Sequence, residues 1–212
     1  MNRLNRDQMA ARVAQDIPEG SVVNLGIGLP TKVANYLPAD REIMLHSENG
    51  VIGMGPAPEA GAEDPDLINA GKQPVTLLDG GAYFHHADSF GMMRGGHLDI
   101  CVLGAFQVSR NGDLANWHTG DADAIPAVGG AMDLAIGAKS VYVLMELLTR
   151  DGQSKLVEQC SYPLTGVGCV SRIYTDLAVF DLKDGKILLA DDVSGVGIAE
   201  LTRLTGIDIV AA

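Results

Sequence analysis

Residues 21–30 read Ser21-Val22-Val23-Asn24-Leu25-Gly26-Ile27-Gly28-Leu29-Pro30, and this stretch decides the fold class. Its first half contains two β-branched valines and predicts a short β-strand. Gly26 and Gly28 end that strand, and Pro30 stands where the first turn of a helix accepts proline, so a helix is predicted over residues 31–37. A strand that leads through a glycine turn into a helix is the repeating unit of α/β proteins.

The rest of the chain continues this alternation and adds two hairpins. Short apolar or β-branched runs predict further strands at residues 42–46, 75–78, 98–103, 105–109, 114–117, 140–145, 173–182 and 186–190. Helical spacing of apolar residues predicts helices at residues 5–16 (with Asn5 as N-cap), 87–93, 131–136 and 198–204. Residues 50–72 are rich in Gly, Pro, Asp and Glu, which predicts a long irregular segment. Together these patterns predict an α/β fold with an open mixed sheet flanked by helices, in one domain spanning residues 1–212.

Composition excludes several classes of protein. The chain has 212 residues and a formal charge of −12, and nucleic-acid binding requires a basic surface instead. No apolar run approaches the length of about 18 residues that a membrane-spanning helix needs, and the first residues lack the apolar core of a secretory signal. The three cysteines, Cys101, Cys160 and Cys169, form no paired framework, so we expect a reducing cytoplasm.

Glu48 is the first candidate for chemistry. It follows a predicted strand in the run His46-Ser47-Glu48-Asn49-Gly50, on a turn that contains glycine. Strand ends at the edge of an α/β sheet are where such proteins bind ligands, and a carboxylate there can be a nucleophile, a base or a metal ligand. Charged turn residues are more often simply solvated, so position alone does not assign Glu48 a role.

Two glycine pairs are the next candidates. Asn24 precedes Gly26 and Gly28, whose backbone N–H groups could form an anion-binding nest, although the dinucleotide pattern G-x-G-x-x-G is incomplete here. Gly129 and Gly130 stand at a predicted helix start, where free N–H groups could stabilise a developing oxyanion. A plain strand-to-helix turn explains the first pair equally well, and close helix–strand packing explains the second.

Other chemistry-bearing residues form no accepted pattern. His85-His86-Ala87-Asp88 suggests a ligand cluster, yet adjacent residues of a strand point to opposite faces and no H-E-x-x-H or C-x-x-C motif accompanies them. Asp121-Ala122-Asp123 lacks the other acidic residues and the glycine of a calcium loop. Cys101 lies in an apolar strand and is expected to be a core thiol. We therefore expect no metal site, and the absence of a G-x-S-x-G elbow disfavours a serine hydrolase.

Taken in order, several segments resemble the B (beta) subunit of the family I 3-oxoacid CoA-transferases. Ser47-Glu48-Asn49-Gly50 resembles the glutamate motif of the family, and residues 24–28 resemble its glycine turn. The other matching segments are 66–72, 93–97, 112–117, 129–133 and 162–166. Residues 84–90 and 116–120 favour the 3-oxoadipate branch over the succinyl-CoA:acetoacetate branch.

The resemblance implies a fold, a reaction and a partner. The fold would be that of CoA-transferases, related to sugar-phosphate isomerases, and the reaction would pass CoA from succinyl-CoA to 3-oxoadipate in aromatic degradation. Glu48 would be the nucleophile of a ping-pong transfer through a glutamyl-CoA thioester, with no cofactor besides the CoA thioester substrate. Substrate or oxyanion contacts would come from Asn24, Gly26, Gly28, Asn49, Gly129 and Gly130. A separate A subunit would complete the site and supply positive charge, to which Lys72 and Arg94 of this chain could add.

Three alternatives stay open from the sequence. The same chemistry could serve another acceptor, such as acetoacetate. A non-catalytic module that senses sugar phosphates would share the scaffold without needing Glu48. A sugar-phosphate isomerase would use the carboxylate as a base and would form no covalent intermediate.

Overall fold

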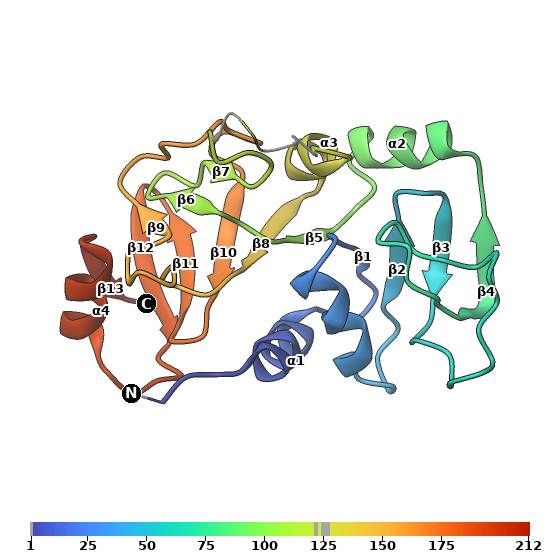
Figure 1. Ribbon diagram of the computed structural model, residues 1–212, viewed down its shortest axis with the longest axis horizontal. Coiled ribbons are helices and arrows are strands. Elements are labelled where there is room, and N and C mark those ends of the chain that lie inside the picture. The colour runs from blue at the N-terminus through green and yellow to red at the C-terminus, as the bar shows by residue number, and fades with distance from the viewer. Residues whose placement is uncertain (1, 121–122, 124–127) are drawn as a thin grey trace.

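A ten-stranded mixed sheet crosses the computed structural model of the chain, which describes residues 2–120, 123 and 128–212 (Figure 1). From one edge to the other, the strands are β13 (Ile209–Ala211), β12 (Lys186–Asp191), β11 (Val179–Lys183), β10 (Val170–Tyr174), β8 (Ser140–Leu144), β5 (Ile100–Leu103), β1 (Val22–Leu25), β2 (Met44–Ser47), β3 (Val51–Met54) and β4 (Leu77–Tyr83). A second, small sheet has the order β7 (Leu114–Ala115), β6 (Gln107–Ser109) and β9 (Leu156–Val157). The predicted open mixed sheet is thereby confirmed.

The centre of the large sheet is parallel. Strands β2, β1, β5, β8 and β10 each run parallel to their neighbour in this series, whereas β3, β4, β11 and β12 pair antiparallel on the two sides. Parallel strands bring their carboxyl ends to one edge, and side chains that follow them meet there. The residues after β1, β2, β5 and β8 are therefore neighbours in space although they are far apart in sequence.

Helices cover both faces of the sheet. α1 (Arg6–Asp16) and the 3₁₀ helix η1 (Leu29–Tyr36) pack on one face, while α2 (His86–Arg94), α3 (Ala131–Gly137) and α4 (Ile198–Thr205) contribute to the core of the other. α2 and α3 lie side by side at the top of Figure 1. Strand β5 shows why both faces must be covered, since alternate buried side chains enter the two separate hydrophobic cores.

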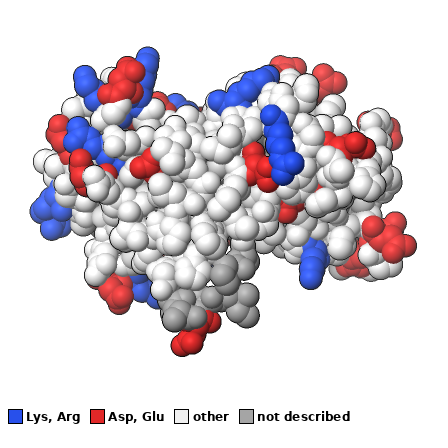
Figure 2. All heavy atoms as spheres, turned by 90° about the horizontal axis from the view of Figure 1, so that it is seen from above, with Lys and Arg blue, Asp and Glu red and all other residues white. Residues whose placement is uncertain are grey.

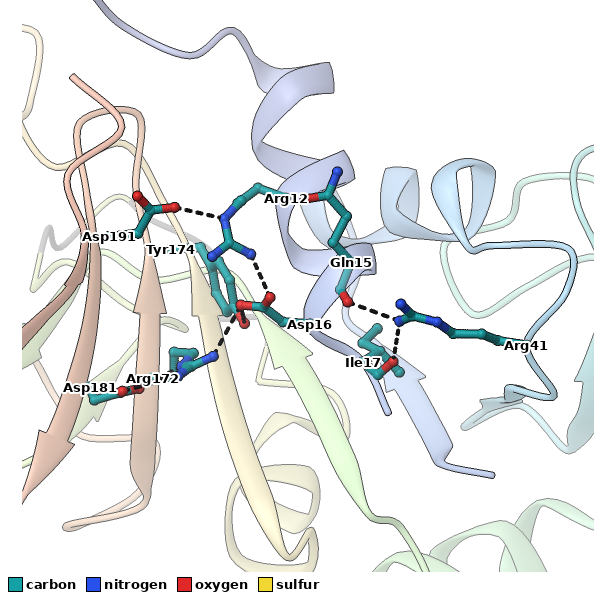
Figure 3. A network of polar contacts seen from close by, with 9 residues as sticks. All are labelled: Arg12, Gln15, Asp16, Ile17, Arg41, Arg172, Tyr174, Asp181 and Asp191. Atoms are coloured by element: carbon teal, nitrogen blue, oxygen red, sulfur yellow. Dashed lines mark hydrogen bonds and ion pairs between the residues drawn. The ribbon is translucent and has the colours of Figure 1, made fainter. Parts of the chain in front are cut away.

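α1 is defined at both ends by polar contacts. At its start, Asn5 and Gln8 form a capping box in which each side chain accepts the other's backbone N–H at 2.9 Å. At its end, Arg41 donates to the carbonyl oxygens of Gln15 (2.9 Å) and Ile17 (3.0 Å), as Figure 3 shows. These oxygens have no partner within the helix, so the arginine satisfies groups that would otherwise depend on water.

An ionic network fixes α1 to the C-terminal strands (Figure 3). Asp16 at its centre accepts from Arg12 at 2.5 Å, from Arg172 at 3.0 Å and from the hydroxyl of Tyr174 at 3.0 Å. Two aspartates of neighbouring strands bind the same guanidinium groups: Asp181 and Asp191. Several bonds to one carboxylate restrict its geometry more than an isolated surface pair does.

Most of the predicted elements are confirmed, and the exceptions have local causes. The segment 50–72 was predicted to be irregular, which is wrong for its first residues because β3 pairs antiparallel with β2 through the Glu48–Gly50 turn. The single strand predicted over 173–182 is also wrong. A turn at Thr175 separates β10 from β11, where the Thr175 hydroxyl accepts from the N–H of Ala178 at 2.9 Å.

Smaller differences concern the type and length of elements. The helix predicted over 31–37 is the 3₁₀ helix η1, and the strand predicted over 75–78 begins later and continues to Tyr83 as β4. Two short strands, β9 and β13, were not predicted, because two or three apolar residues carry no periodic signal. None of the described helices is long and apolar enough to cross a membrane.

Candidate active site

A cavity of about 660 Å³ lies at the carboxyl ends of the central parallel strands. Its walls include residues that end or directly follow four neighbouring strands: Glu48 after β2, Leu25 and Gly26 at β1, Leu103 and Gly104 at β5, and Leu144, Met145 and Glu146 at β8. Residues 128–131, at the start of α3, form another part of the wall. The topology of the sheet thus assembles this cavity, as α/β folds do for ligand sites.

A tight hairpin turn presents Glu48. Gly50 adopts a φ of +104°, and a Cβ at this position would overlap the carbonyl oxygen of Phe84. Hydrogen bonds from Gly50 N–H to Ser47 O and from Phe84 N–H to Gly50 O, both of 3.0 Å, hold the turn in place. Only glycine combines this backbone conformation with such a close approach, so the Asn-Gly sequence after Glu48 has a structural reason.

The Glu48 carboxylate is half-buried beside the start of α3. Burial raises its pKa above the usual value, and the negative charge of Asp133 acts in the same direction. The nearby His86 and a hydrogen bond from the Gly130 backbone N–H act in the opposite direction and lower the pKa. No lysine or arginine among the described residues forms an ion pair with Glu48. A carboxylate in this position is available for reaction.

Gly130 approaches Glu48 so closely that it has room for no side chain. A Cβ at Gly130 would overlap the Oε2 atom of Glu48 and would lie 3.3 Å from Phe90. The backbone of Gly130 has ordinary angles, φ −85° and ψ 6°, which any residue can adopt. Its identity is therefore explained by space and not by conformation. A Cβ at Gly129 would be 3.8 Å from Oε1, which is ordinary contact.

A buried hydrogen-bonded chain lies behind this turn. Asn24 Nδ2 is 3.0 Å from His46 Nδ1 and donates to His46 O at 3.1 Å, and His46 Nε2 is 3.0 Å from Ser89 Oγ. All three residues are buried, and burial lowers the pKa of His46 to about 4. The imidazole is therefore neutral near pH 7, with Nδ1 accepting from Asn24 and the Nε2 proton directed at Ser89.

The same contacts determine which atom Asn24 offers to the cavity. Both protons of its amide are directed at His46, one at the ring nitrogen and one at the carbonyl oxygen. The remaining polar atom, Oδ1, has no hydrogen-bond partner among the described residues, and Asn24 lines the cavity. Asn24 can consequently accept a hydrogen bond from a ligand but cannot donate one.

The other predicted site residues divide into two groups. Gly26 and Gly129 line the cavity with Glu48, Asn24 and Gly130, but the N–H of Gly26 already donates to Val102 O at 2.8 Å. Gly28 and Asn49 are not among the residues that line it. Asn49 instead donates to Ile68 O at 2.8 Å, and the Ala70 N–H donates to Ser47 Oγ at 3.0 Å. These bonds hold the 66–72 segment against the turn, so that Ala70 reaches the cavity wall.

The histidines and cysteine considered as metal ligands are not gathered into one group among the described residues. His85 and His86 stand at the N-terminus of α2, so the expectation that they alternate along a strand was wrong. No group of metal-ligating side chains was found within residues 2–120, 123 and 128–212. The candidate Asp121–Asp123 loop falls mostly outside the described residues. Cys101 is fully buried, and burial strongly raises the pKa of its thiol.

Of the two cations considered from the sequence, Arg94 forms an ion pair, whereas the Lys72 side chain forms none with a described residue. Arg94 Nε donates to Asp133 at 2.6 Å, and its guanidinium lies over the ring of Phe90. Lys72 has a left-handed backbone with φ 61°, unusual for a residue other than glycine.

Residues not considered from the sequence also belong to the site. His46 and Ser89 support Asn24, while Arg6, Glu146, Arg150 and Lys155 line the far end of the cavity. Their sequence neighbourhoods carry no motif, so spatial proximity alone identifies them.

The fold is that of the coenzyme A transferases. The structure is similar to the acyl-CoA transferase YdiF of Escherichia coli O157:H7, with a TM-score of 0.76 and 20% identity, covering 98% of this chain and 42% of that one. It is also similar to glutaconate coenzyme A-transferase of Acidaminococcus fermentans, with a TM-score of 0.70 and 18% identity, covering 100% and 90% of the two chains. The decarboxylase AibA/AibB shares the fold, with a TM-score of 0.69 and 20% identity over 98% of this chain and 85% of that one. Fold alone therefore does not fix the reaction.

Sequence comparison establishes the family. The model of the coenzyme A transferase family matches residues 6–197, and the chain belongs to this family. It is 62% identical over 211 residues to the B subunit of 3-oxoadipate CoA-transferase of Acinetobacter baylyi, covering 100% of this chain and 97% of that protein. The protein of the same name in Pseudomonas putida is 64% identical, covering 98% and 97%. The B subunit of a probable succinyl-CoA:3-ketoacid coenzyme A transferase of Bacillus subtilis is 48% identical, covering 98% and 95%.

Proposed function

We propose that this chain is the B subunit of an enzyme that transfers CoA from succinyl-CoA to 3-oxoadipate, with Glu48 as the nucleophile. The single observation that carries the assignment of Glu48 is its environment. It is a half-buried carboxylate without an ion pair to any described cation, it lines the cavity at the strand ends, and its one backbone donor is Gly130. The relatives with 62% and 64% identity bear the name of that enzyme, which supports the choice of substrates.

The proposed reaction has two exchanges on one carboxylate. A Glu48 oxygen attacks the thioester carbonyl of succinyl-CoA, and CoA leaves as a thiolate while a mixed anhydride forms. The thiolate then attacks the glutamyl carbonyl of this anhydride, releasing succinate and leaving CoA on Glu48 as a thioester. The carboxylate of 3-oxoadipate reverses these steps and leaves as its CoA ester. The thioester bond is exchanged and never hydrolysed, so no cofactor beyond the substrates is required.

Two neighbours have roles that follow from their contacts. Gly130 lies directly against the Glu48 carboxylate, and its N–H lowers the pKa of that group, so this N–H would face the oxyanion that forms when the thiolate attacks the glutamyl carbonyl. Asn24 offers only an acceptor, which suits an amide N–H of the pantetheine arm. The half-buried position of Glu48 reduces its exposure to water, which would hydrolyse the anhydride.

A second polypeptide is part of the proposal. The relatives are named as B subunits, which implies a separate A subunit. Exposed apolar side chains include Met132 and Ile136 on α3 and Leu164 and Val167 on the loop between β9 and β10, and Gly166 of that loop lies close to Ala135 of α3. Figure 2, a view onto the side with α2 and α3, shows wide uncharged areas between the charged groups. Such areas are typical of protein interfaces. We further propose one domain over residues 1–212, which the continuous sheet supports, and a cytoplasmic location, which the three free cysteines support.

An acceptor other than 3-oxoadipate is the main rival. Relatives named for 3-ketoacids reach 46% to 48% identity, which is lower than the relatives named for 3-oxoadipate. Initial rates of the assembled enzyme with 3-oxoadipate and with acetoacetate distinguish the two. A kcat/KM that is higher for acetoacetate would reassign the acceptor and leave the chemistry unchanged. A sugar-phosphate sensor or isomerase gains no support from these relatives.

Trapping the covalent intermediate tests the nucleophile. The enzyme assembled with its A subunit is incubated with succinyl-CoA and then reduced with borohydride, which converts a glutamyl thioester to an alcohol. We expect loss of activity and a modification that peptide mass spectrometry assigns to Glu48. Glu19→Gln, at an exposed carboxylate after α1, is the control and should be trapped as the native enzyme is. An unmodified Glu48 in an inactivated enzyme would contradict the mechanism.

A further inference from the structure

The end of the cavity opposite Glu48 gathers positive charge. Arg6 at the start of α1, and Arg150 and Lys155 on the hairpin that follows β8, all line this end, together with one carboxylate, Glu146. Three cations and one carboxylate give this lobe a net positive charge, whereas the whole chain carries −12. In such an acidic protein, a local reversal of charge inside a cavity indicates an anionic ligand.

Two of these three cations have no ionic partner in the described chain. Arg6 donates to Glu146 at 3.2 and 3.3 Å, but neither Arg150 nor Lys155 forms an ion pair there. Lys155 is half-buried, and burial lowers its pKa, while the negative charges of Glu146 and Asp176 raise it. A half-buried ammonium group has lost part of its hydration, and a bound anion would offset that loss.

The hairpin of residues 147–155 holds these cations at a fixed place. Lys155 N–H donates to Leu147 O at 2.9 Å, and Thr149 N–H donates to Gln153 O at 2.8 Å, so the two arms are paired up to the tip that carries Arg150. A further bond, from Val108 N–H to Lys155 O at 2.9 Å, ties the hairpin to β6 of the small sheet. A lobe built on paired strands is organised before the ligand arrives.

Sheet geometry gives the distance between this lobe and the nucleophile. Glu48 follows β2 and Glu146 follows β8, and the two strands are separated by β1 and β5. Three spacings of about 4.8 Å separate β2 from β8, so the residues after β8, where the lobe begins, lie about 14 Å from Glu48. The pantetheine arm of CoA has roughly the backbone length of four extended residues, which also reach about 14 Å. A thioester sulfur at Glu48 thus sets the phosphates of CoA at the cationic lobe.

We propose that Arg6, Arg150 and Lys155 form a binding site in this chain for the phosphate groups of CoA. The inference rests on the proposed function, because it takes the CoA thioester to react at Glu48. The carboxylate of the acyl group is a poorer candidate for the same cations. It lies within the length of about two extended residues of the reacting carbon, or about 7 Å, which is half the required distance. Guanidinium and ammonium groups are the side chains that phosphates bind.

Substrates with and without phosphates test this site. In the assembled enzyme we compare succinyl-CoA with succinyl-pantetheine for Arg150→Gln, Lys155→Met and the double variant. The double variant should raise KM for succinyl-CoA about tenfold or more, with kcat within about twofold, while KM for succinyl-pantetheine stays unchanged. The salt dependence of KM for succinyl-CoA should also become weaker. Lys186→Gln, an exposed lysine at the distant β11–β12 hairpin, is the matched control and should behave as the native enzyme does.

A binding measurement keeps this inference separate from the proposed reaction. Calorimetric titration with CoA and with pantetheine gives the affinity of each variant without any turnover. A weaker affinity for CoA alone supports the site even if the native enzyme transfers no CoA between the tested acids, a result that would overturn only the proposed function. Equal losses for both ligands, or no loss for either, would overturn the phosphate site. Arg150 is exposed at a hairpin tip, so its variant separates binding from any folding defect of Lys155→Met.

Discussion

Two carboxylates on opposite sides of the sheet's centre have contrasting environments. Asp16, beside the C-terminal strands, receives hydrogen bonds from two guanidinium groups and a tyrosine hydroxyl. Glu48, after β2, has a backbone N–H from Gly130 and no ion pair with a described lysine or arginine. Burial raises the pKa of Glu48, and the nearby His86 and the Gly130 N–H oppose this shift. The contrast separates a carboxylate used for stability from one available for chemistry.

The difference follows from which groups the chain places nearby. Around Asp16 the sequence supplies Arg12 four residues earlier on α1 and Arg172 on β10, both directed at the carboxylate. Around Glu48 it supplies Gly129 and Gly130, and the nearby ionisable side chains are His86 and Asp133, while no lysine or arginine among the described residues forms an ion pair with Glu48. We expect substitutions in the first region to change stability and substitutions in the second to change catalysis.

Removing the Glu48 carboxylate should have the largest effect. Glu48→Ala in the assembled enzyme should lower kcat by about 10⁴-fold or more, because no other group can form the covalent intermediate. Its thermal midpoint should stay within about 2 °C of the native value. Steady-state rates and thermal unfolding measure the two effects. If Glu48→Ala kept a tenth of the native rate, Glu48 would not be the nucleophile and its contrast with Asp16 would have no catalytic meaning.

Gly130→Ala should come next. The backbone angles accept alanine, but the new Cβ would overlap the Glu48 carboxylate and displace it. We expect kcat/KM to fall by about 10² to 10³-fold, the usual cost of disturbing an oxyanion donor. Gly91→Ala on α2 is the matched control, because a Cβ there meets nothing within 4 Å. If Gly130→Ala and Gly91→Ala have equal rates, the close approach of Gly130 is unimportant.

Protonation of His46 should make the free energy of unfolding depend on pH. Its folded pKa is lowered to about 4 by burial, whereas in the unfolded chain it is near 6.5, so its contribution to stability is complete above pH 6.5. The native protein should lose about 3 kcal/mol from this source as the pH falls from 7 to 4. His46→Gln should be less stable at pH 7 and should show a shallower pH dependence in urea unfolding. His97→Gln, at an exposed histidine, should leave the slope unchanged, and an unchanged slope for His46→Gln would contradict the assignment.

Arg172→Met tests the opposite region. The substitution keeps an apolar stem but leaves Asp16 paired with Arg12 alone and removes the arginine that pairs with Asp181. We expect a loss of about 2 kcal/mol, since the groups are only partly buried, and kcat within about twofold of native. Arg203→Met removes the pair with Glu200 from an exposed helix face and should cost clearly less stability than Arg172→Met. Equal costs at the two sites would mean that the network adds nothing.

The smallest effect concerns the charge of Glu48 itself. Because its folded pKa is raised, the stability it contributes is present below the unfolded pKa and lost as the pH rises through the folded one. Glu48→Gln cannot ionise, so it should exceed the native stability at pH 7 by a few tenths of a kcal/mol, a value reduced by solvent screening. The difference should shrink towards pH 4.5 in urea unfolding. Glu19→Gln should show no such trend, and a less stable Glu48→Gln at pH 7 would reverse the predicted sign.

Local patterns in the sequence predicted much of the fold but less of the site. Helix caps and alternating strands are short-range features, so Asn5 and the β5 strand were identified correctly. β3 was not, because glycines on both sides of Val51 and Ile52 suggested a loop, and the pairing that stabilises it comes from β2. Tertiary pairing decides such short strands, and the sequence does not display it.

The site shows the same limit more strongly. Glu48 stands out by its position at a strand end and by the resemblance of its neighbours to a family. Its contact with Gly130 joins residues 82 positions apart, and the bond from His46 to Ser89 joins residues 43 apart. Lys155 belongs to no sequence motif. It lines the same cavity as Glu48 because the sheet order places β8 only three strands from β2. Sheet order, which no local pattern encodes, brings these groups together.

The one-sided hydrogen bonding of Asn24 has a consequence for the design of inhibitors. Because both amide protons are held by His46, a compound gains nothing by presenting a carbonyl or ether oxygen to this residue. A compound that places an N–H or O–H group against Oδ1 gains a bond, and methylation of that nitrogen removes it and adds bulk. Pairs of N–H and N-methyl pantetheine analogues would thus report, by their relative potency, which amide of a bound CoA lies beside β1.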